Sequence, residues 1–315
     1  MIADGSPCAD SEAAAALGEV AAVVVNYNAR HVLSACLASL RAEGIGEIVV
    51  VDNGSADGSE SVVRACDPAA MWLSSGANIG YGRAANLGAG RTASGALLVC
   101  NPDVVVRPGT VAALLSALEA DPSVGIVGPR LLNADGTVYP SARSFPSLVD
   151  AAGHGLLGLI WAANPFSRRY KLLDWDHADE RTVDWVSGAC LLVRRPAWDE
   201  IGGFDPSFFM YMEDVDLCWR ANRAGWRVRY QPAGEVTHLQ GVSTNATPYR
   251  MILAHHRSLW HFAQRTTAGW RRWLLPVLAP AMATRAGFAC LRHWLDVRHA
   301  RREAATRHGP NGAVR

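Results

Sequence analysis

The chain has 315 residues, 50% of them hydrophobic, so it can bury a full core and global disorder is excluded. Its seven cysteines are scattered, odd in number and without a CxxC pair, so the sequence indicates neither a disulfide framework nor a zinc knuckle. The net charge of +1 conceals an asymmetry, because residues 250–315 carry twelve arginines against two acidic residues and the rest of the chain is acidic.

The first 18 residues are acidic and rich in alanine, and they contain neither a basic start nor a continuous apolar run. This composition argues against a signal peptide, and we expect a disordered N-terminus. Together with the scattered cysteines, it indicates a protein of the reducing cytoplasm.

Residues 19–131 alternate between strand-like and helix-like patterns. Short apolar runs rich in β-branched residues predict strands over 19–28, 45–55, 69–75, 95–103 and 124–131. Helical spacing of apolar residues predicts helices over 31–44, 55–66, 80–92 and 109–121. Such alternation is typical of an α/β protein with a doubly wound, mostly parallel sheet.

The regular alternation ends beyond residue 131. The sequence still predicts strands over 184–195 and 226–233 and helices over 196–203 and 213–225. Neither an internal repeat nor a low-complexity linker divides this region. We therefore expect one catalytic domain over residues 19–245, followed by a tail over 246–315.

The tail interleaves its arginines with four tryptophans, Trp260, Trp270, Trp273 and Trp294. Its longest uncharged stretch, 273–284, has only twelve residues and is broken by Pro276 and Pro280, whereas a spanning helix needs about 20 apolar residues. We therefore expect a basic amphipathic helical tail that lies on an anionic membrane surface. A solvated helical cap on the core is the alternative, and nucleic acid is a third partner that we do not favour.

Polar side chains follow three of the predicted strands at the point where each strand ends. They are Asn26 and Asn28, Asp52 and Asn53, and Asn101 and Asp103. Because ligands of an open parallel sheet bind outside the carboxyl ends of its strands, we expect these side chains to line one crevice. The sequence lacks a GxGxxG motif after the first strand and a P-loop, so it predicts a nucleotide held by side chains and a metal.

The segment "NPDVVV" is suited to hold that metal. Pro102 carries the chain out of the strand, so that the carboxylate of Asp103 faces the crevice. One carboxylate together with diphosphate oxygens commonly binds a hard divalent cation. His238, after the last predicted strand, is a candidate second ligand, although a lone histidine is more often a hydrogen-bonded structural residue.

Six blocks in a fixed order carry a family resemblance: "VVVNYN", "VDNGSADGS", "NIGYGRAANLG", "NPDVVV", "SGACLLVRR" and "GGFDPSFFMYMEDVDLCWR". Over about residues 20–245 the chain resembles the inverting glycosyltransferases of family 2, in particular their bacterial rhamnosyltransferase-like branch. The resemblance implies a GT-A fold, a nucleotide-diphosphate sugar donor and a divalent metal, Mg²⁺ or Mn²⁺.

Within that branch the chain looks most like enzymes that add rhamnose from dTDP-rhamnose to N-acetylglucosaminyl-diphosphoryl-polyprenol during cell-wall polysaccharide synthesis. This implies a polyprenyl-diphosphate-linked acceptor and a peripheral position on the inner face of the plasma membrane. Sugar identity depends on the shape of the pocket, so a galactofuranosyl- or mannosyltransferase is the main rival. A noncatalytic sugar-nucleotide sensor and a nucleotidyltransferase are less favoured, the latter because it would need a glycine-rich loop and lysines near the N-terminus.

The resemblance also implies roles for single residues. Asp52 would recognise the base of the nucleotide, Asp103 would be the remaining acid of the DxD motif with Asn101 in place of the first Asp, and His238 would complete the metal site. The expected nucleotide-sugar site comprises Asn26, Asn28, Asp52, Asn53, Asn78, Gly80, Arg83, Asn86, Asn101 and Asp103.

In "FFMYMEDVD" the resemblance makes Asp214 the general base and places Glu213 against the acceptor. Glu213 and Asp216 would raise the pKa of Asp214 and the start of a helix would lower it, and the sequence does not give the sign of the sum. Phe208, Phe209 and Tyr211 would form an apolar wall that excludes water. The alternative is that the three acids only begin a helix and the aromatic residues are core.

Overall fold

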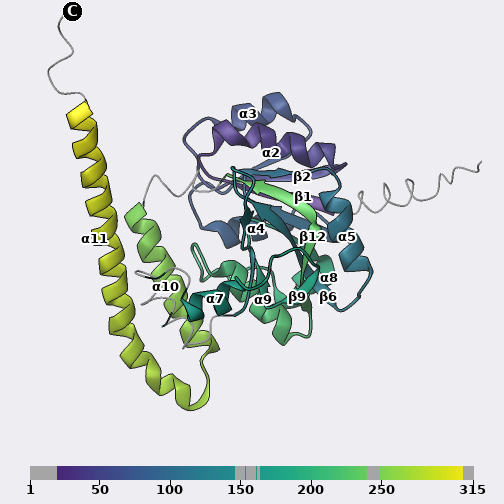
Figure 1. Ribbon diagram of the computed structural model, residues 1–315. Helices are drawn as coiled ribbons and strands as arrows, with labels where there is room; N and C mark the ends of the chain where they lie inside the picture. The colour runs from purple at the N-terminus through teal and green to yellow at the C-terminus, as the bar shows by residue number, and fades with distance from the viewer. Residues whose placement is uncertain (1–19, 146–152, 154–160, 162–163, 240–247, 308–315) are drawn as a thin grey trace, which may run out of the picture. The chain divides into compact units, whose positions relative to one another are not determined.

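The structure is a computed structural model that describes residues 20–145, 153, 161, 164–239 and 248–307 (Figure 1). The chain divides into two compact units, residues 1–246 and residues 247–315. The N-terminus that we expect to be disordered, residues 1–18, lies outside the described residues.

A ten-stranded sheet forms the centre of the first unit. Its main path runs in the order β3-β2-β1-β4-β11-β6-β12-β5. The strands are β1 (Val20–Asn26), β2 (Glu47–Asp52), β3 (Met71–Ser74), β4 (Ala96–Cys100), β5 (Val104–Val106), β6 (Val124–Leu132), β11 (Cys190–Arg194) and β12 (Arg227–His238), with β7 (Val138–Tyr139) beside β6 and β9 (Arg181–Val183) beside β12. The neighbours β3, β2, β1 and β4 are parallel, as are β6 and β12, whereas β11 runs antiparallel to both β4 and β6. The predicted mostly parallel, doubly wound sheet is therefore confirmed.

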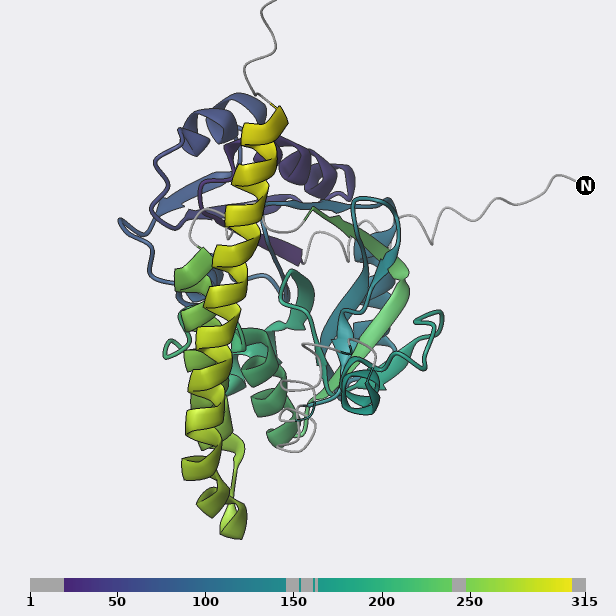
Figure 2. The same cartoon turned by 60° about the vertical axis from the view of Figure 1, so that its left-hand side comes forward.

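Helices cover both faces of this sheet (Figures 1 and 2). They are α2 (Arg30–Ala42), α3 (Ser59–Cys66), α4 (Tyr81–Ala89), α5 (Thr110–Glu119), α7 (Pro165–Lys171), α8 (Arg195–Ile201) and α9 (Glu213–Arg223). Apolar residues of α2 and α5 join one side of the strands in the main buried core. On the opposite face α4 approaches β1 and β2 so closely that a Cβ at Gly88 would lie 2.8 Å from a methyl group of Val51. Strands buried on both faces explain the continuous apolar runs of the sequence.

The region after residue 131 differs from the sequence prediction. The strand that we predict over 184–195 is two strands, because the chain leaves the main sheet: β10 (Trp185–Val186) pairs antiparallel with β8 (Ala142–Arg143), and only β11 joins the sheet. The strand predicted over 226–233 continues to His238, past a register shift between Gln231 and Glu235. The sequence pattern does not predict α7 or the strands β5, β7, β8 and β9, because these elements are too short to show a period.

The second unit consists of helices, as the tail prediction states: α10 (Pro248–Thr266), the 3₁₀ turn η1 (Gly269–Leu274) and α11 (Leu275–Arg307). The expected break at the two prolines is wrong. Pro276 lies in the first turn of α11, where a missing N–H costs nothing, and the helix continues through Pro280. In the described part of the chain, no helix is both long enough and apolar enough to cross a membrane.

Candidate active site

The first cluster of the site lies at the carboxyl ends of β1 and β2. These strands are parallel and bring Asn26 opposite Asp52, where the Asn26 amide donates to the Asp52 carboxylate over 3.1 Å. The same carboxylate accepts the backbone N–H of Ser55, and the Ser55 hydroxyl accepts the backbone N–H of Asn28. Asn28 has a left-handed backbone with φ of 49°, and its side chain accepts the N–H of Ala56. These bonds build a small cradle around Asp52, the residue that we expect to recognise the base of the nucleotide.

A second set of bonds joins β2 to the start of α4. The Asn53 side chain donates to Asn78 over 3.2 Å and accepts the N–H of Ile79 over 2.9 Å. The N–H of Gly80 donates in turn to the Asn78 side chain. The structure thus brings Asn53, Asn78 and Gly80 together beside the cradle.

Arg83 and Asn86 on α4 have a different setting. The Arg83 guanidinium donates to the carbonyl of Pro206, and the Asn86 amide both donates to and accepts from the backbone of Phe204. These bonds hold the segment 204–206 against α4. The sequence predicts that both residues bind the nucleotide sugar, and this stays a prediction. In the structure their hydrogen bonds position the segment 204–206.

The two predicted metal ligands lie together. Because β5 pairs antiparallel with β12, His238 lies beside the start of β5, and its Nε2 is 3.2 Å from an oxygen of Asp103. The Asn101 amide is 3.3 Å from the same nitrogen. Asp103 is buried, and His238 Nδ1 is buried without a hydrogen-bond partner in the described part of the chain.

The donor atoms of Asp103 and His238 are suited to a metal. One carboxylate and one imidazole fit a divalent cation whose remaining ligands are phosphate oxygens and water. Among the described residues no third His, Cys, Asp or Glu completes a ligand group, so protein atoms alone do not form a closed site. The residues therefore suit a cation that arrives with a diphosphate ligand.

The acidic pair begins α9, which starts at Glu213. Tyr211 and Met212 precede it with φ values of 66°, a left-handed conformation that non-glycine residues rarely adopt. Such conformations persist only where neighbouring contacts impose them, and they concentrate at functional sites. The contact is the Phe209 carbonyl, which accepts the N–H of Tyr81 and packs on Gly80, where a Cβ would clash with it.

Asp214 is held from two sides. One carboxylate oxygen accepts the N–H of Gly188 over 2.9 Å, and the other accepts the N–H of Val215 over 2.9 Å. The carbonyl of Gly188 accepts the Tyr81 hydroxyl over 2.8 Å, so Gly188 joins α4 to the acid. Asp214 is only half-buried, and its carboxylate can therefore meet a substrate hydroxyl.

Glu213 and Asp214 form a coupled acidic pair. Burial, followed by the charge of Asp214, raises the pKa of Glu213 to about 8. Burial also raises the pKa of Asp214, although the N–H groups of Gly188 and Val215 and the charge of Arg143 oppose the rise. Asp214 has these donors, whereas Glu213 Oε2 is buried without a hydrogen-bond partner among the described residues. We therefore assign the shared proton to Glu213 and the negative charge to Asp214.

Two expectations about the neighbours of this pair need correction. Phe208 is 1% exposed and belongs to the core, so of the predicted aromatic wall only Phe209, 38% exposed, and the half-buried Tyr211 remain. Asp216 is fully buried and forms an ion pair with Arg220 over 2.7 Å, and Arg220 donates to the carbonyl of Gly203. Through Arg220, Asp216 therefore holds the segment at Gly203 against α9. The main cause of the raised pKa of Asp214 is the burial of Asp214 itself.

The sequence analysis missed three residues that shape the site: Tyr81, Gly188 and Arg143. Gly188 lies in the quoted block "SGAC", and a Cβ there would come within 3.0 Å of the Asp214 Cβ. Tyr81 follows Gly80 in another quoted block. Arg143 lies outside all six blocks, and only the folded chain shows that its charge acts on Asp214.

Comparison with known proteins identifies the family of the chain. The sequence model of the glycosyltransferase-like family 2 matches residues 18–263. An N-acetylglucosaminyl-diphospho-decaprenol L-rhamnosyltransferase of Mycobacterium tuberculosis is 40% identical over 298 residues, which cover 90% of this chain and 95% of the relative. A low-salt glycan biosynthesis hexosyltransferase of Haloferax volcanii is 27% identical and covers 72% of this chain and 69% of the relative.

Among solved structures, a mannosyltransferase from Pyrobaculum calidifontis in complex with GDP-Man and Mn²⁺ has a TM-score of 0.55 at 17% identity, covering 93% of this chain and 76% of that one. At this identity the likeness concerns the fold alone, and it confirms the expected GT-A-type architecture. Since the family model spans most of the chain and the mycobacterial relative aligns over nearly all of it, the protein belongs to the glycosyltransferase-like family 2.

Proposed function

We propose that the protein transfers L-rhamnose from dTDP-rhamnose to a hydroxyl of a polyprenyl-diphosphate-linked N-acetylglucosamine, with inversion at the anomeric carbon. The observation that carries the proposal is the 40% identity with the mycobacterial rhamnosyltransferase over 90% of the chain. The half-buried Asp214 with its fixed hydrogen bonds supports an enzyme rather than a sugar-nucleotide sensor, because a sensor needs no base.

In this proposal Asp214 accepts the proton of the acceptor hydroxyl as the hydroxyl oxygen bonds to the anomeric carbon. The bond from that carbon to the donor diphosphate breaks, and its electron pair leaves with the nucleoside diphosphate. A raised pKa improves Asp214 as a base, since a base works best when its pKa lies near the operating pH. Gly188 and Val215 fix the carboxylate by their N–H groups.

Donor binding is assigned to the cradle around Asp52 and to the pair of Asp103 and His238. Asp52 would hold the base of the nucleotide. Asn26 donates to its carboxylate directly, and Asn28 donates to Ser55, whose N–H binds the same carboxylate. Asp103 and His238 would hold a divalent cation, Mg²⁺ or Mn²⁺, which when bound would neutralise charge on the departing diphosphate.

The test is transfer by the purified protein to a synthetic N-acetylglucosaminyl-diphosphoryl lipid, with dTDP-rhamnose, UDP-galactofuranose and GDP-mannose offered separately. We expect product with dTDP-rhamnose and a change of configuration by nuclear magnetic resonance. Product only with another donor would replace rhamnose by that sugar, and donor binding without any transfer would favour the sensor.

We further propose that the second unit attaches the enzyme to an anionic membrane, where a lipid-linked acceptor resides. Its 3₁₀ turn η1 has the sequence "GWRRWL", with Trp270 70% and Trp273 82% exposed beside exposed Arg271 and Arg272. Exposed tryptophan and arginine favour the headgroup layer, and each basic residue near an anionic leaflet contributes about 1 kcal/mol.

The test is co-sedimentation with anionic and with neutral vesicles. We expect binding to anionic vesicles that weakens as salt is raised, and loss of binding for a double variant Trp270→Ser, Trp273→Ser. As the control for folding, the double variant is assayed on a short-chain, water-soluble acceptor, on which its activity should match that of the wild type. If both proteins stay in the supernatant equally with anionic vesicles at low salt, the second unit is a solvated cap and does not bind the membrane.

A further inference from the structure

Two half-buried cations lie on β8 and α7, which pack against each other. Arg143 ends the short strand β8, and Lys171, the single lysine of the chain, ends α7. In the described part of the chain no carboxylate forms an ion pair with either, whereas Arg168 pairs with Asp174 and Arg220 pairs with Asp216. A partly buried cation without a counter-ion is costly unless a ligand supplies the charge.

Arg143 is held in place by neutral groups. Its guanidinium carbon lies 5.4, 5.8 and 5.1 Å from the ring centres of Tyr139, Tyr170 and Trp185. Its Nε donates to the Pro140 carbonyl and its Nη2 to the Tyr139 hydroxyl, both over 2.8 Å. Aromatic faces and neutral oxygens orient a guanidinium, but they do not neutralise it. The guanidinium of Arg143 is therefore held in one orientation and keeps its positive charge.

The cations influence each other and the base. Burial and the positive charge of Arg143 lower the pKa of Lys171. The same guanidinium lowers the pKa of Asp214 against the larger effect of burial. The charge of Arg143 therefore acts on the acid that receives the acceptor proton. Lys171 follows Tyr170, whose ring centre lies 5.8 Å from the Arg143 guanidinium and whose carbonyl accepts the N–H of Ser144, so the second cation lies on a segment joined to the first.

Strand pairing and hydrogen bonds link Arg143 to Asp214. Arg143 pairs with Trp185 in the sheet of β8 and β10, and the Trp185 indole donates to the Ser144 carbonyl over 2.9 Å. Three residues after Trp185, the N–H of Gly188 holds the Asp214 carboxylate. A ligand group bound by Arg143 is therefore fixed relative to the base.

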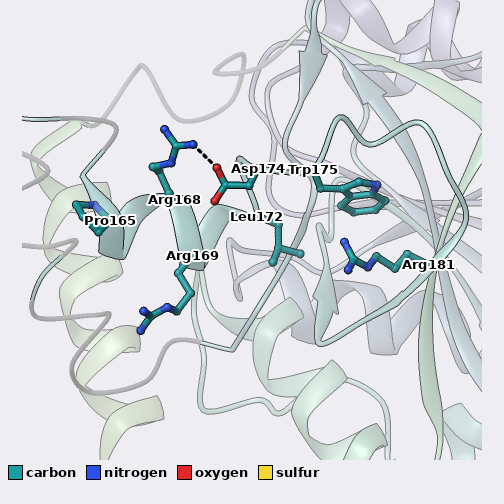
Figure 3. Close-up of a pocket in the computed structure, with 7 residues that line it drawn as sticks. All are labelled: Pro165, Arg168, Arg169, Leu172, Asp174, Trp175 and Arg181. Carbon is teal, nitrogen blue, oxygen red and sulfur yellow. Dashed lines mark hydrogen bonds and ion pairs between the residues drawn. The ribbon is translucent and has the colours of Figure 1, made fainter.

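A hollow of about 600 Å³ lies beside α7 (Figure 3). Of the arginines that line it, Arg168 pairs with Asp174, and Arg181, whose guanidinium lies 5.2 Å from the Trp175 ring centre, is exposed to solvent. Arg143 and Lys171 are instead half-buried, and no carboxylate in the described part of the chain forms an ion pair with either. Because a half-buried cation is less well hydrated than an exposed one, these two are the better candidates for binding an anion.

We propose that Arg143 and Lys171 bind the diphosphate of the lipid-linked acceptor and so place the acceptor sugar against Asp214. The inference rests on the proposed function, since it takes from it an acceptor with a diphosphate next to the sugar. The donor also carries a diphosphate, but Asp103 and His238 are available for that one. A planar guanidinium suits phosphate oxygens because it binds them in pairs.

The first experiment compares two acceptors for the wild type, Arg143→Gln and Lys171→Gln. One is an N-acetylglucosaminyl-diphosphoryl lipid, and the other is an alkyl glycoside of N-acetylglucosamine, which has no phosphate. We expect Arg143→Gln to raise KM for the diphosphate acceptor about tenfold or more, with KM for the donor within about twofold. Loss of the Arg143 charge also acts on Asp214 with either acceptor, so the loss of kcat/KM on the glycoside should be about tenfold smaller than the loss on the diphosphate acceptor. Arg64→Gln is the matched control, because Arg64 is exposed on α3 and pairs only with Glu60.

Two results would overturn the inference. Equal losses on both acceptors would mean that Arg143 only supports the frame of Gly188 and Asp214. A raised KM for the donor would mean that the cations serve the departing diphosphate.

The second experiment does not need turnover. Calorimetry measures binding of geranyl diphosphate, and we expect about tenfold weaker binding to Arg143→Gln, with little change for Arg143→Lys, Arg64→Gln or Asp103→Ala. If no glycosyl transfer is found but this pattern holds, the proposed function fails and the diphosphate site stands. If Arg143→Gln, with an unchanged thermal midpoint, binds as the wild type does, the site is wrong.

Discussion

Replacement of Glu213 by Gln tests the assignment of the shared proton. Glu213 is 7% exposed, and its pKa is raised from an ordinary value of 4.5 to about 8 by burial and by Asp214. The folded chain therefore keeps this proton between pH 4.5 and about 8, whereas the unfolded chain releases it. Since the folded pKa is the higher one, the stability that Glu213 contributes is present below pH 4.5 and is lost as pH rises toward 8.

The size of this effect follows from the shift. One pKa unit corresponds to about 1.4 kcal/mol, so the loss reaches on the order of 3 kcal/mol at pH 7 and on the order of 5 kcal/mol above pH 8. Gln has the same shape and does not titrate, so Glu213→Gln removes this part of the pH dependence. We expect the variant to become progressively more stable relative to the wild type as pH rises.

The assay is urea unfolding of both proteins at pH 5.5, 7.0 and 8.5. The difference in free energy of unfolding should change by about 1.4 kcal/mol per pH unit between the first two values. Groups that are not coupled to Glu213 titrate alike in both proteins, so their effects cancel in the difference. A difference that stays constant with pH would refute the assignment of the proton to Glu213, whatever the sign of the constant.

Four other variants test the remaining assignments. Asp214→Asn should lower kcat by about 10² to 10⁴-fold while donor affinity survives, and turnover near the wild type would remove Asp214 as the base. Asp103→Ala and His238→Ala should each weaken donor binding in the presence of Mn²⁺, measured by calorimetry, and equal affinities with and without chelator would contradict a metal role. Gly188→Ala should lower kcat far more than the thermal midpoint, because a Cβ there would press on Asp214 at 3.0 Å, and an unchanged kcat would show that the base tolerates displacement.

The sequence predicts most of the first half of the fold because its helices are periodic and most of its strands are continuous apolar runs. Strands such as 45–55 are buried on both faces, so an apolar run identifies them without any knowledge of their partners. The predicted strand over 184–195 fails for the opposite reason. Its apolar residues serve two sheets, and the change of direction at Ser187 and Gly188 depends on a contact with Asp214 from far along the chain.

The residues of the candidate site divide in the same way, into those that the sequence identifies and those that only distant contacts in the fold reveal. Asp52, Asp103 and His238 were identified because they follow strands, and the pairing of β5 with β12 then brings the last two within 3.2 Å. Arg83 and Asn86 lie on a motif, but hydrogen bonds to residues more than a hundred positions away determine their contacts. Arg143 has no local signal at all, because its importance comes from three aromatic rings and an acid that the fold brings together.

The position of the base depends on contacts that run through the whole first unit. Tyr211 and Met212 hold left-handed conformations that cost about 1 to 3 kcal/mol each, so the segment before Asp214 would relax if its supports were removed. One support is the contact of Phe209 with Gly80 and Tyr81, and the other is the bridge from Tyr81 through Gly188 to Asp214. Gly80 is in turn bound to Asn78 and Asn53 at the end of β2. The residues assigned to the donor therefore also hold the base in place, and a ligand that orders the segment 78–81 would order Asp214 with it.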